Sequence, residues 1–329
     1  MAYQKVFKRY EIKYMITIEQ MQRILATMAP YMTQDRFGHA TIRNIYFDTD
    51  DYVLARHSIV KPDFKEKIRI RSYSKAREKS EVFVELKRKF DKVVYKRRVG
   101  LTEKQAMDWT CRRLTPGMTG ASTAASENED TGSLKAHTAI SAVNGQLGSE
   151  IEYFLDYYGE LRPAVFLSYD REAFKMKDGT DFRVTFDSNI LARDYDLSLE
   201  SDVYGTNVLD RGKVLMELKC SGGIPMWMTD VLSREHIYKT SFSKYGKVYT
   251  QMILPALQHD RSTASAAAAA KADKETAAQP LSAAVSQGGY GRRRRRSRSG
   301  RHELQNSGRF AAFTFLRRSM ASHSLHNIG

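Results

Sequence analysis

Residues 82–89 read VFVELKRK, and this short stretch carries the pattern that decides the fold. Side chains on a β-strand alternate between its two faces. On such a strand Glu85, Lys87 and Lys89 share one face, and the opposite face is largely apolar. The stretch therefore predicts a strand with one charged and one apolar face, which taken alone is typical of a half-buried sheet whose polar face lies in water.

The same alternation is found on at least seven predicted strands, of which 82–89 is one. The charged residues that align on one face of their strands are Arg9, Glu11 and Lys13; Lys67, Arg69 and Arg71; Lys96 and Arg98; and Glu217 and Lys219, with Arg171 and Arg183 on two further strands. A face in contact with water normally mixes hydroxyls, amides and both charges, whereas these faces are mainly Lys and Arg. Repetition on this scale favours charged faces that line the inside of a barrel.

An interior crowded with cations would repel itself unless an anion occupied it. A chain of phosphates is such an anion, because each phosphoryl oxygen accepts several charge-assisted hydrogen bonds from Arg and Lys. The pattern therefore predicts a binding site for a triphosphate or a polyphosphate.

The periodicity of apolar residues along the chain predicts the helices and strands. Strands are predicted at 6–16, 41–47, 66–73, 81–89, 92–99, 163–171, 181–187 and 213–220, and helices at 18–31, 50–58, 102–113, 150–160, 225–235 and 242–254. Thr17 and Gln20 form a capping-box pattern at the first helix. The predicted fold class is α+β, an eight-stranded antiparallel β tunnel with flanking helices.

Composition divides the 329 residues into a body and a tail. Residues 1–260 are predicted to form one domain, with a flexible insertion at about 114–148 that is rich in Gly, Ser and Thr. Residues 261–329 carry 13 Lys and Arg against 3 Asp and Glu, most of the net charge of +15, and are predicted to be a disordered basic tail. Arg292–Arg298 within it could contact nucleic acid or an anionic surface, although a solvated tail is the simpler interpretation.

Several classes of protein are disfavoured. The sequence has no run of 18 apolar residues, so no transmembrane segment is predicted. The N-terminus also lacks the apolar core of a signal peptide. The only cysteines, Cys111 and Cys220, cannot build a disulfide framework and suit a reduced, cytoplasmic compartment. No GxxxxGK[ST] loop occurs either, so a P-loop nucleotide site is not expected.

Glutamates among the basic residues suggest a metal. A carboxylate that faces phosphate is repelled unless a divalent cation lies between them, and Mn²⁺ or Mg²⁺ binds through one or two carboxylates plus substrate phosphates. Glu11, Glu85 and Glu217 are the candidate ligands. Pairing with Lys or Arg on a neighbouring strand is the equally open alternative for each of them.

Nine short motifs occur in order over about residues 5–255: FKRYEIKY at 7–14, IRNIYFDTDD at 42–51, KIRIRSY at 67–73, VFVELKRK at 82–89, YKRRV at 95–99, LSYDREAF at 167–174, DFRVTFD at 181–187, VLMELKC at 214–220 and SFSKYGKVY at 241–249. Together, and in this order, they resemble the VTC domain, the catalytic domain of the vacuolar transporter chaperone polyphosphate polymerases. That domain belongs to the triphosphate tunnel metalloenzyme superfamily.

The resemblance implies transfer of the γ-phosphate of ATP to a growing polyphosphate chain, with Mn²⁺ or Mg²⁺ required. The residues that it implies in catalysis are Lys13, Arg69, Arg71, Lys87 and Lys219, and those that it implies in substrate binding are Lys96, Arg98, Arg171, Arg183, Lys244 and Lys247. Arg9 and Lys67, which the alternation places on the same charged faces, are further candidates for substrate binding. Glu217 matches the family's metal-binding glutamate. Charge neutralisation and positioning would supply most of the catalysis.

One departure separates this chain from the superfamily pattern. The opening motif Glu-x-Glu-x-Lys begins here with Arg9, which removes one potential metal ligand and suits binding of a phosphate chain better than hydrolysis. Two alternatives stay open: a triphosphatase of the same superfamily, and a non-catalytic protein that binds polyphosphate or nucleic acid through its tail.

Overall fold

The computed structural model describes residues 10–90, 93–111 and 145–277. The chain divides into two units, residues 1–270 and 271–329. Of the second unit, only the end of one helix lies in the described residues. The description below concerns the first unit, in which all elements but the end of that helix lie.

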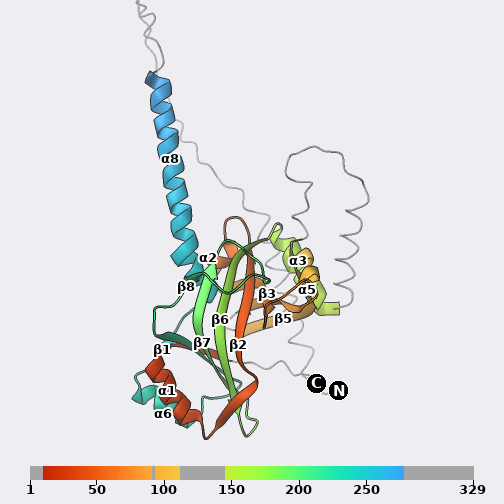
Figure 1. Ribbon diagram of the computed structural model, residues 1–329, viewed down its shortest axis with the longest axis vertical. Helices are drawn as coiled ribbons and strands as arrows, with labels where there is room; N and C mark the ends of the chain where they lie inside the picture. Colours follow the sequence, from red (N-terminus) through yellow and green to blue (C-terminus); the bar gives the residue numbers. More distant parts are fainter. Residues whose placement is uncertain (1–9, 91–92, 112–144, 278–329) are drawn as a thin grey trace, which may run out of the picture. The chain divides into compact units, whose positions relative to one another are not determined.

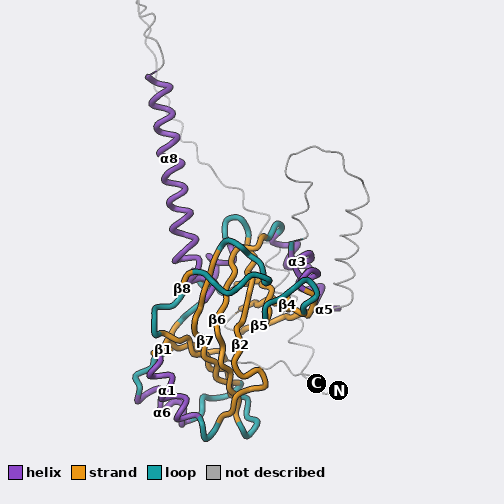
Figure 2. Tube along the Cα trace, viewed as in Figure 1, coloured by secondary structure: helices purple, strands orange, loops and turns teal. Residues whose placement is uncertain are grey.

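A large sheet and several helices make up this unit (Figures 1 and 2). The strands are β1 (Tyr10–Thr17), β2 (Met32–Asp48), β3 (Phe64–Ser72), β4 (Glu81–Phe90), β5 (Val93–Thr102), β6 (Arg162–Met176), β7 (Phe182–Arg193), β8 (Thr206–Asn207), β9 (Lys213–Cys220) and β10 (Lys239–Thr240). The helices are α1 (Ile18–Met28), α2 (Val53–Val60), α3 (Glu103–Thr110), α5 (Gly145–Tyr158), α6 (Met226–Arg234), α7 (Lys244–Val248) and α8 (Leu254–Ala277), with a π-helical turn at Tyr249–Ile253.

The ten strands form one antiparallel sheet in the order β10-β1-β9-β7-β6-β2-β3-β4-β5, and β8 pairs with β7. The predicted α+β class is confirmed, whereas the strand count and the closure differ from the eight-stranded closed barrel. The extra strands, β8 and β10, have two residues each and are too short for an alternating pattern. The sheet stays open because β10 takes the free edge of β1 and leaves β5 at the other edge.

The open sheet is nevertheless strongly curled. Six ladder steps separate β1 from β4 along the sheet, about 29 Å if the sheet were flat. Yet Lys87 on β4 donates to both carboxylate oxygens of Glu11 on β1, at 3.3 and 3.1 Å. The two ends of the sheet therefore face each other, and the face that carries these side chains is concave. We call it the inner face.

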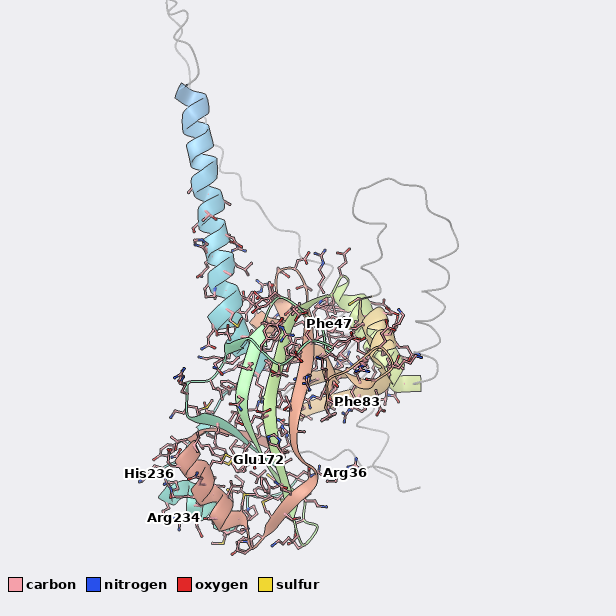
Figure 3. The ribbon with its side chains drawn as sticks, viewed as in Figure 1. Arg36, Phe47, Phe83, Glu172, Arg234 and His236 are labelled. Carbon is pink, nitrogen blue, oxygen red and sulfur yellow. The ribbon has the colours of Figure 1, made fainter. Side chains whose placement is uncertain are left out.

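Helices α1 and α6 cover the outer face of β1, β9 and β7. Their apolar side chains join those of the three strands in one buried cluster, which includes Ile24 and Met28 of α1 and Val231 of α6. Arg234 and His236, labelled in Figure 3, mark the C-terminal end of α6. Thr17 caps α1 as predicted: Gln20 N donates to its hydroxyl at 3.2 Å, and Thr17 N donates back to the Gln20 side chain at 2.9 Å.

Helices α3 and α5 cover the outer face of β3, β4 and β5 in the same way. Trp109 of α3 and Phe154 of α5 are buried there against alternate residues of β4, among them Val84. The outer face thus supplies the apolar half of the alternation read from residues 82–89. The sequence pattern predicted this burial correctly, because a charged inner face leaves the other face to form the core.

Helix α7 and the following π-helical turn lie against the inner face instead. Tyr245 and Val248 pack in a third buried cluster with the inner-face residues Tyr46, Tyr169 and Leu215. The Tyr245 ring stacks on Tyr46, with centroids 4.7 Å apart. This segment therefore fills part of the concave face with apolar side chains, and the charged residues occupy the remainder.

The predicted element boundaries are met within five residues, with three exceptions. Strand β2 begins nine residues before the predicted 41–47, β7 runs six residues past its predicted end, and α8 continues the helix predicted at 242–254 to Ala277. Residues 261–277, expected to be disordered, are thus helical, and 278–329 lie outside the described residues. Residues 114–144 of the predicted insertion lie outside them as well, whereas its last residues, 145–148, form the first turn of α5 and are not a loop. No helix within the described ranges has the length and hydrophobicity needed to cross a bilayer. Cys111 and Cys220 are both free thiols.

Candidate active site on the inner face

The register of the sheet places the predicted charged residues on one face. Residues that pair across antiparallel strands point to the same side. Lys13 pairs with Glu217, and Glu217 pairs with Thr185. Followed strand by strand, this reasoning assigns to the inner face Glu11, Lys13, Lys67, Arg69, Arg71, Glu85, Lys87, Lys96, Arg98, Arg171, Arg183, Glu217 and Lys219.

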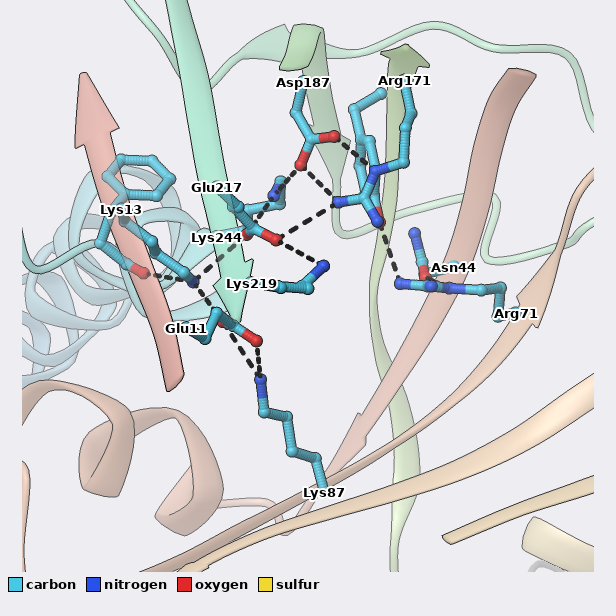
Figure 4. A network of polar contacts seen from close by, with 12 residues as sticks. Glu11, Lys13, Asn44, Arg71, Lys87, Arg171, Asp187, Glu217, Lys219 and Lys244 are labelled. Carbon is cyan, nitrogen blue, oxygen red and sulfur yellow. Dashed lines mark hydrogen bonds and ion pairs between the residues drawn. The ribbon is translucent and has the colours of Figure 1, made fainter. Parts of the chain in front are cut away.

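Glu217 is the centre of one half of this network (Figure 4). Its carboxylate lies 3.4 Å from Lys13 Nζ and 3.3 Å from Lys219 Nζ. It is also 3.6 Å from Arg171 Nη2 and 3.5 Å from Lys244 Nζ, and its side chain is only 7% exposed. Burial opposes ionisation, but Lys244, Lys219, Lys13 and Arg171 together hold the pKa of Glu217 well below its usual range. Glu217 is therefore a buried anion held by four cations.

Asp187 is a second buried anion in the same half of the network. Arg171 donates to both of its oxygens, at 2.6 and 2.7 Å, and Lys244 donates to Oδ2. Asp187 is fully buried, and the pKa of its carboxyl is lowered because Arg171 and Lys244 outweigh burial. Through this contact, Lys244 of α7 is anchored across the concave face onto β7.

The other half of the network is centred on Glu85. Arg69 donates to Glu85 Oε2 through Nε and Nη2, at 3.0 and 2.8 Å. Lys96 Nζ lies 2.6 Å from Oε1 and Arg98 Nε lies 3.4 Å from it. Burial opposes ionisation of this carboxyl, yet Arg69, Arg71 and Lys96 keep the pKa of Glu85 well below normal. Both oxygens are thus already engaged by cations from neighbouring strands.

Neutral side chains fix the direction of the arginines. Arg71 donates to Asn44 Oδ1 at 3.0 Å and to the Tyr169 hydroxyl at 2.9 Å. Arg69 donates to the Tyr46 hydroxyl at 2.7 Å. Each hydrogen bond removes a degree of freedom from a long side chain, so the guanidinium groups are held ready for an anion.

Glu11 joins the two ends of the curled sheet. Its carboxylate receives Lys87 from β4 and lies 3.4 Å from Lys13 Nζ on its own strand. Burial raises its pKa, but Lys87, with Lys13 and Lys219, more than compensates, so that the pKa falls to about 2. Glu11 is consequently ionised throughout the physiological range.

Next to Glu85, lysines dominate the inner face at the start of β3 and the end of β4. Lys65 pairs with Lys89 and Lys67 pairs with Lys87 across β3 and β4. Like charges directly opposite each other are destabilising. Lys67 has no hydrogen bond or ion pair with any described residue, and its pKa is lowered well below normal by burial and by Lys87, Lys13 and Arg69. We call these two pairs the lysine ladder.

The remaining predicted residues lie outside the network. Arg183 is on the inner face but is exposed, next to Lys219 and Lys175 in register. Lys247 is exposed on α7 and, among the described residues, has no ion-pair partner. Arg9 lies outside the described residues, as does Arg292–Arg298 of the basic tail.

The carboxylates of the inner face are the candidate ligands of a divalent metal. Within residues 10–90, 93–111 and 145–277, no group of three or more His, Cys, Asp and Glu side chains has the spacing of a metal site. Glu217 and Glu11 are both ionised and share Lys13 Nζ as a neighbour at 3.4 Å, so their carboxylates lie close together, where substrate phosphates would have to complete the coordination of a metal. All three glutamates have the cation partners that were the alternative at these positions: Lys13 and Lys219 at Glu217, Lys87 at Glu11, and Arg69, Lys96 and Arg98 at Glu85.

Sequence reasoning missed several residues of the network. Asp187 lies two residues from Thr185 and four from Arg183 on the same strand, so the alternation itself could have identified it. Tyr46, Asn44 and Tyr169 could be found only from the register, because nothing in the local sequence connects them to the arginines of β3. Asp48, at the end of β2, stabilises the start of α2 by accepting from Leu54 N and Ala55 N, each at 2.9 Å.

The fold and the site together define an α+β protein whose curled antiparallel sheet gathers cations and a few ionised carboxylates on its inner face. The family model of the VTC domain matches residues 8–253 of the chain. The chain therefore belongs to the VTC domain family, as the motifs indicated, and the match ends at the π-helical turn, before α8.

Solved structures resemble this fold more distantly. A Vibrio parahaemolyticus protein described as a candidate adenylate cyclase shares 10% identity over 74% of this chain and 99% of its own, with a TM-score of 0.35. No curated protein matches the sequence at a significant level.

Proposed function

We propose that this protein is a polyphosphate polymerase that transfers the γ-phosphoryl group of ATP to the end of a polyphosphate chain bound on its inner face. Membership of the VTC domain family supports this class of reaction. The observation that carries the proposal beyond the family is the lysine ladder. Lys65, Lys67 and Lys89 have no carboxylate partner among the described residues, and they extend the cationic face past the compensated cluster around Glu85.

The ladder favours a polymeric anion. Arg69, Arg71 and Arg171 are already oriented by carboxylates, Asn44 and tyrosine hydroxyls, as expected where a reacting phosphoryl group must be positioned. Three lysines of the ladder, Lys65, Lys67 and Lys89, lack such partners among the described residues, and Lys87 has only Glu11 there. An extended polyanion would relieve the repulsion between the opposed lysines. A substrate of only three phosphates would not require this further length of cationic surface.

The chemistry asks little of the protein beyond position and charge. An oxygen of the terminal phosphate attacks the γ-phosphorus of ATP, the bond to the β-phosphate oxygen breaks, and ADP leaves. The attacking oxygen is already anionic, so no general base is required. Lys13, Arg171, Lys219 and Lys244 would neutralise the charge that develops around the transferred group. Glu217 and Glu11 would hold a Mn²⁺ or Mg²⁺ ion, which when bound supplies further neutralisation of phosphate charge.

The carboxylates favour phosphoryl transfer to a chain over hydrolysis. Water is a poor nucleophile that benefits from a basic group. Glu11, Glu217, Glu85 and Asp187 all have pKa values lowered by cationic neighbours that outweigh burial, and a carboxylate of low pKa is a weak base. A triphosphatase is thus the second candidate function and has less support from the site.

A product assay tests the proposal. The full chain is incubated with ATP and Mn²⁺, and polyphosphate and ADP are measured beside the variants Lys13→Ala and Glu217→Gln. We expect long chains from the parent and a loss of about 100-fold or more in both variants, the usual size of an effect on transition-state charge. Lys104→Ala, on the exposed side of α3, is the matched lysine control and should retain full activity.

The outcomes separate the candidates. Free phosphate without chains would identify a triphosphatase. Neither product, with several primers and with either metal, would exclude both enzymes and leave a protein that only binds polyanions. Circular dichroism of each variant distinguishes a lost function from a lost fold.

A further inference from the structure

Thr185 of β7 carries a hydroxyl on the inner face that the network of ion pairs does not use. The Thr185 hydroxyl is buried and has no hydrogen-bond partner, and the residue as a whole is only 7% exposed. Thr185 pairs with Glu217 on β9 and with Ala173 on β6, so its side chain points to the same side as Glu217. Buried hydroxyls in folded proteins almost always have a partner, so this one requires an explanation.

Other buried polar atoms without a hydrogen bond in the described residues differ from Thr185. Glu85 Oε1 and Arg98 Nε lie 3.4 Å apart and form an ion pair. Ser168 and Arg43 pair across β6 and β2 on the outer face of the sheet, away from the site. Thr185 alone among them combines a place on the inner face with the lack of an ionic partner.

Nearby groups of the protein are already engaged. The Glu217 carboxylate is held by Lys13, Lys219, Lys244 and Arg171, and the Asp187 carboxylate by Arg171 and Lys244. The lysines and arginines have no lone pair to accept a hydrogen bond. A hydroxyl among cations is therefore without an acceptor until an oxygen-rich anion enters.

Threonine suits such a role better than a flexible polar residue. Its branched Cβ restricts rotation about χ1, so the hydroxyl is fixed in direction before a ligand binds. Thr185 also lies two residues from Arg183, whose exposed guanidinium points to the same face. We propose that the Thr185 hydroxyl is a substrate-binding group, donating a hydrogen bond to an oxygen of the phosphate chain bound beside Glu217. This inference rests on the proposed function, because it takes a phosphate chain as the ligand.

Two substitutions test the hydroxyl directly. Thr185→Val keeps the shape and removes the hydroxyl, and Thr185→Ser keeps the hydroxyl. For each full-length variant we would measure thermal unfolding without ligand and the Kd for inorganic tripolyphosphate by calorimetry. Removing a buried hydroxyl that has no partner in the free protein should leave the melting temperature unchanged or higher. The Kd should rise about tenfold in Thr185→Val and less than about threefold in Thr185→Ser.

Ser168→Ala is the matched control, since it removes an equally unpartnered hydroxyl from the outer face. It should not change the Kd. The proposal is overturned if Thr185→Val binds tripolyphosphate as the parent does. It is also overturned if Thr185→Val melts several degrees lower with unchanged binding, because an internal partner such as a buried water would then account for the hydroxyl.

The binding assay also separates this inference from the proposed function. A parent that binds tripolyphosphate, weakened tenfold by Thr185→Val, but makes no polyphosphate from ATP would support the role of Thr185 and refute the polymerase. If the parent makes polyphosphate from ATP while Thr185→Val retains full affinity for tripolyphosphate, the polymerase is supported and the role of Thr185 is refuted. A parent with no affinity for tripolyphosphate would overturn the role of Thr185.

Discussion

Among single residues, Asp187 illustrates how the inner face tolerates so many buried charges. It is fully buried, yet Arg171 and Lys244 satisfy both of its oxygens. Burying an ion is costly unless its partner is placed well, and removing one partner leaves the other charge uncompensated. Asp187 therefore positions two cations, Arg171 and Lys244, that we propose neutralise the charge of the transferred phosphoryl group.

Asp187→Asn should destabilise the fold by about 3–5 kcal/mol, because Arg171 and Lys244 lose their counter-charge in a buried setting. Urea unfolding at neutral pH measures this change. Asp230→Asn, at an exposed position of α6, should stay within about 0.5 kcal/mol of the parent. Equal stability of Asp187→Asn and the parent would mean that solvent reaches the Asp187 site and screens the charges.

At the level of elements, the segment from β10 to the π-helical turn has the largest influence on the site. β10 pairs with β1, and the Phe242 carbonyl accepts a hydrogen bond from Lys13 at 3.0 Å. Lys244 reaches Asp187, and the Tyr245 hydroxyl donates to Asp48 at 2.7 Å. The segment thus fixes Lys13 and supplies Lys244, although it is far from both partners in the sequence.

Removal of residues 261–329 should leave polyphosphate synthesis within about twofold of the parent, because every residue of the network precedes Arg261 and the family match ends at residue 253. Removal of residues 242–329 should abolish it, since Lys244 and the apolar contacts of Tyr245 are lost. Both truncations are assayed with ATP and Mn²⁺. If the variant that lacks only residues 261–329 loses all function, the tail would instead be favoured as the element that binds the polyanion.

For the molecule as a whole, the ionised carboxylates of the inner face make the free energy of unfolding depend on pH. Cationic neighbours, outweighing burial, lower the pKa of Glu11 to about 2 and the pKa values of Glu85, Glu217 and Asp187 below normal. Between the usual carboxyl pKa of about 4.5 and the lowered values, the unfolded chain binds more protons than the folded one. The free energy of unfolding therefore falls as pH decreases through this window.

Glu11→Gln tests this linkage. At pH 7 the variant should be less stable than the parent by about 1–3 kcal/mol, and the difference should shrink as the pH falls from about 4.5 toward 2. Urea unfolding at pH 7, 4.5 and 3 gives the comparison, and Glu160→Gln at an exposed position serves as the control. A difference that is the same at all three pH values would show that Glu11 stabilises the fold by packing rather than by charge.

Much of the fold follows from local patterns. The period-2 alternation in β3, β4 and β9 predicted both the strands and the face that each charged residue occupies. The capping box of Thr17 and Gln20 was predicted correctly because a cap depends on atoms within a few residues. The two-residue strands β8 and β10 were missed because a pattern cannot be read from two positions.

The sequence by itself determined which charged residues share one face of their strand, because the alternation of side chains along a strand is a local property of the backbone. Only the tertiary structure decided which carboxylate meets which cation. Glu11 and Lys87 are joined by the curl of the sheet, Lys244 meets Asp187 through the packing of α7, and Thr185 lacks a partner because its neighbours are already paired. These contacts join residues up to 76 positions apart, and that distance in the sequence is the reason that no local pattern could predict them.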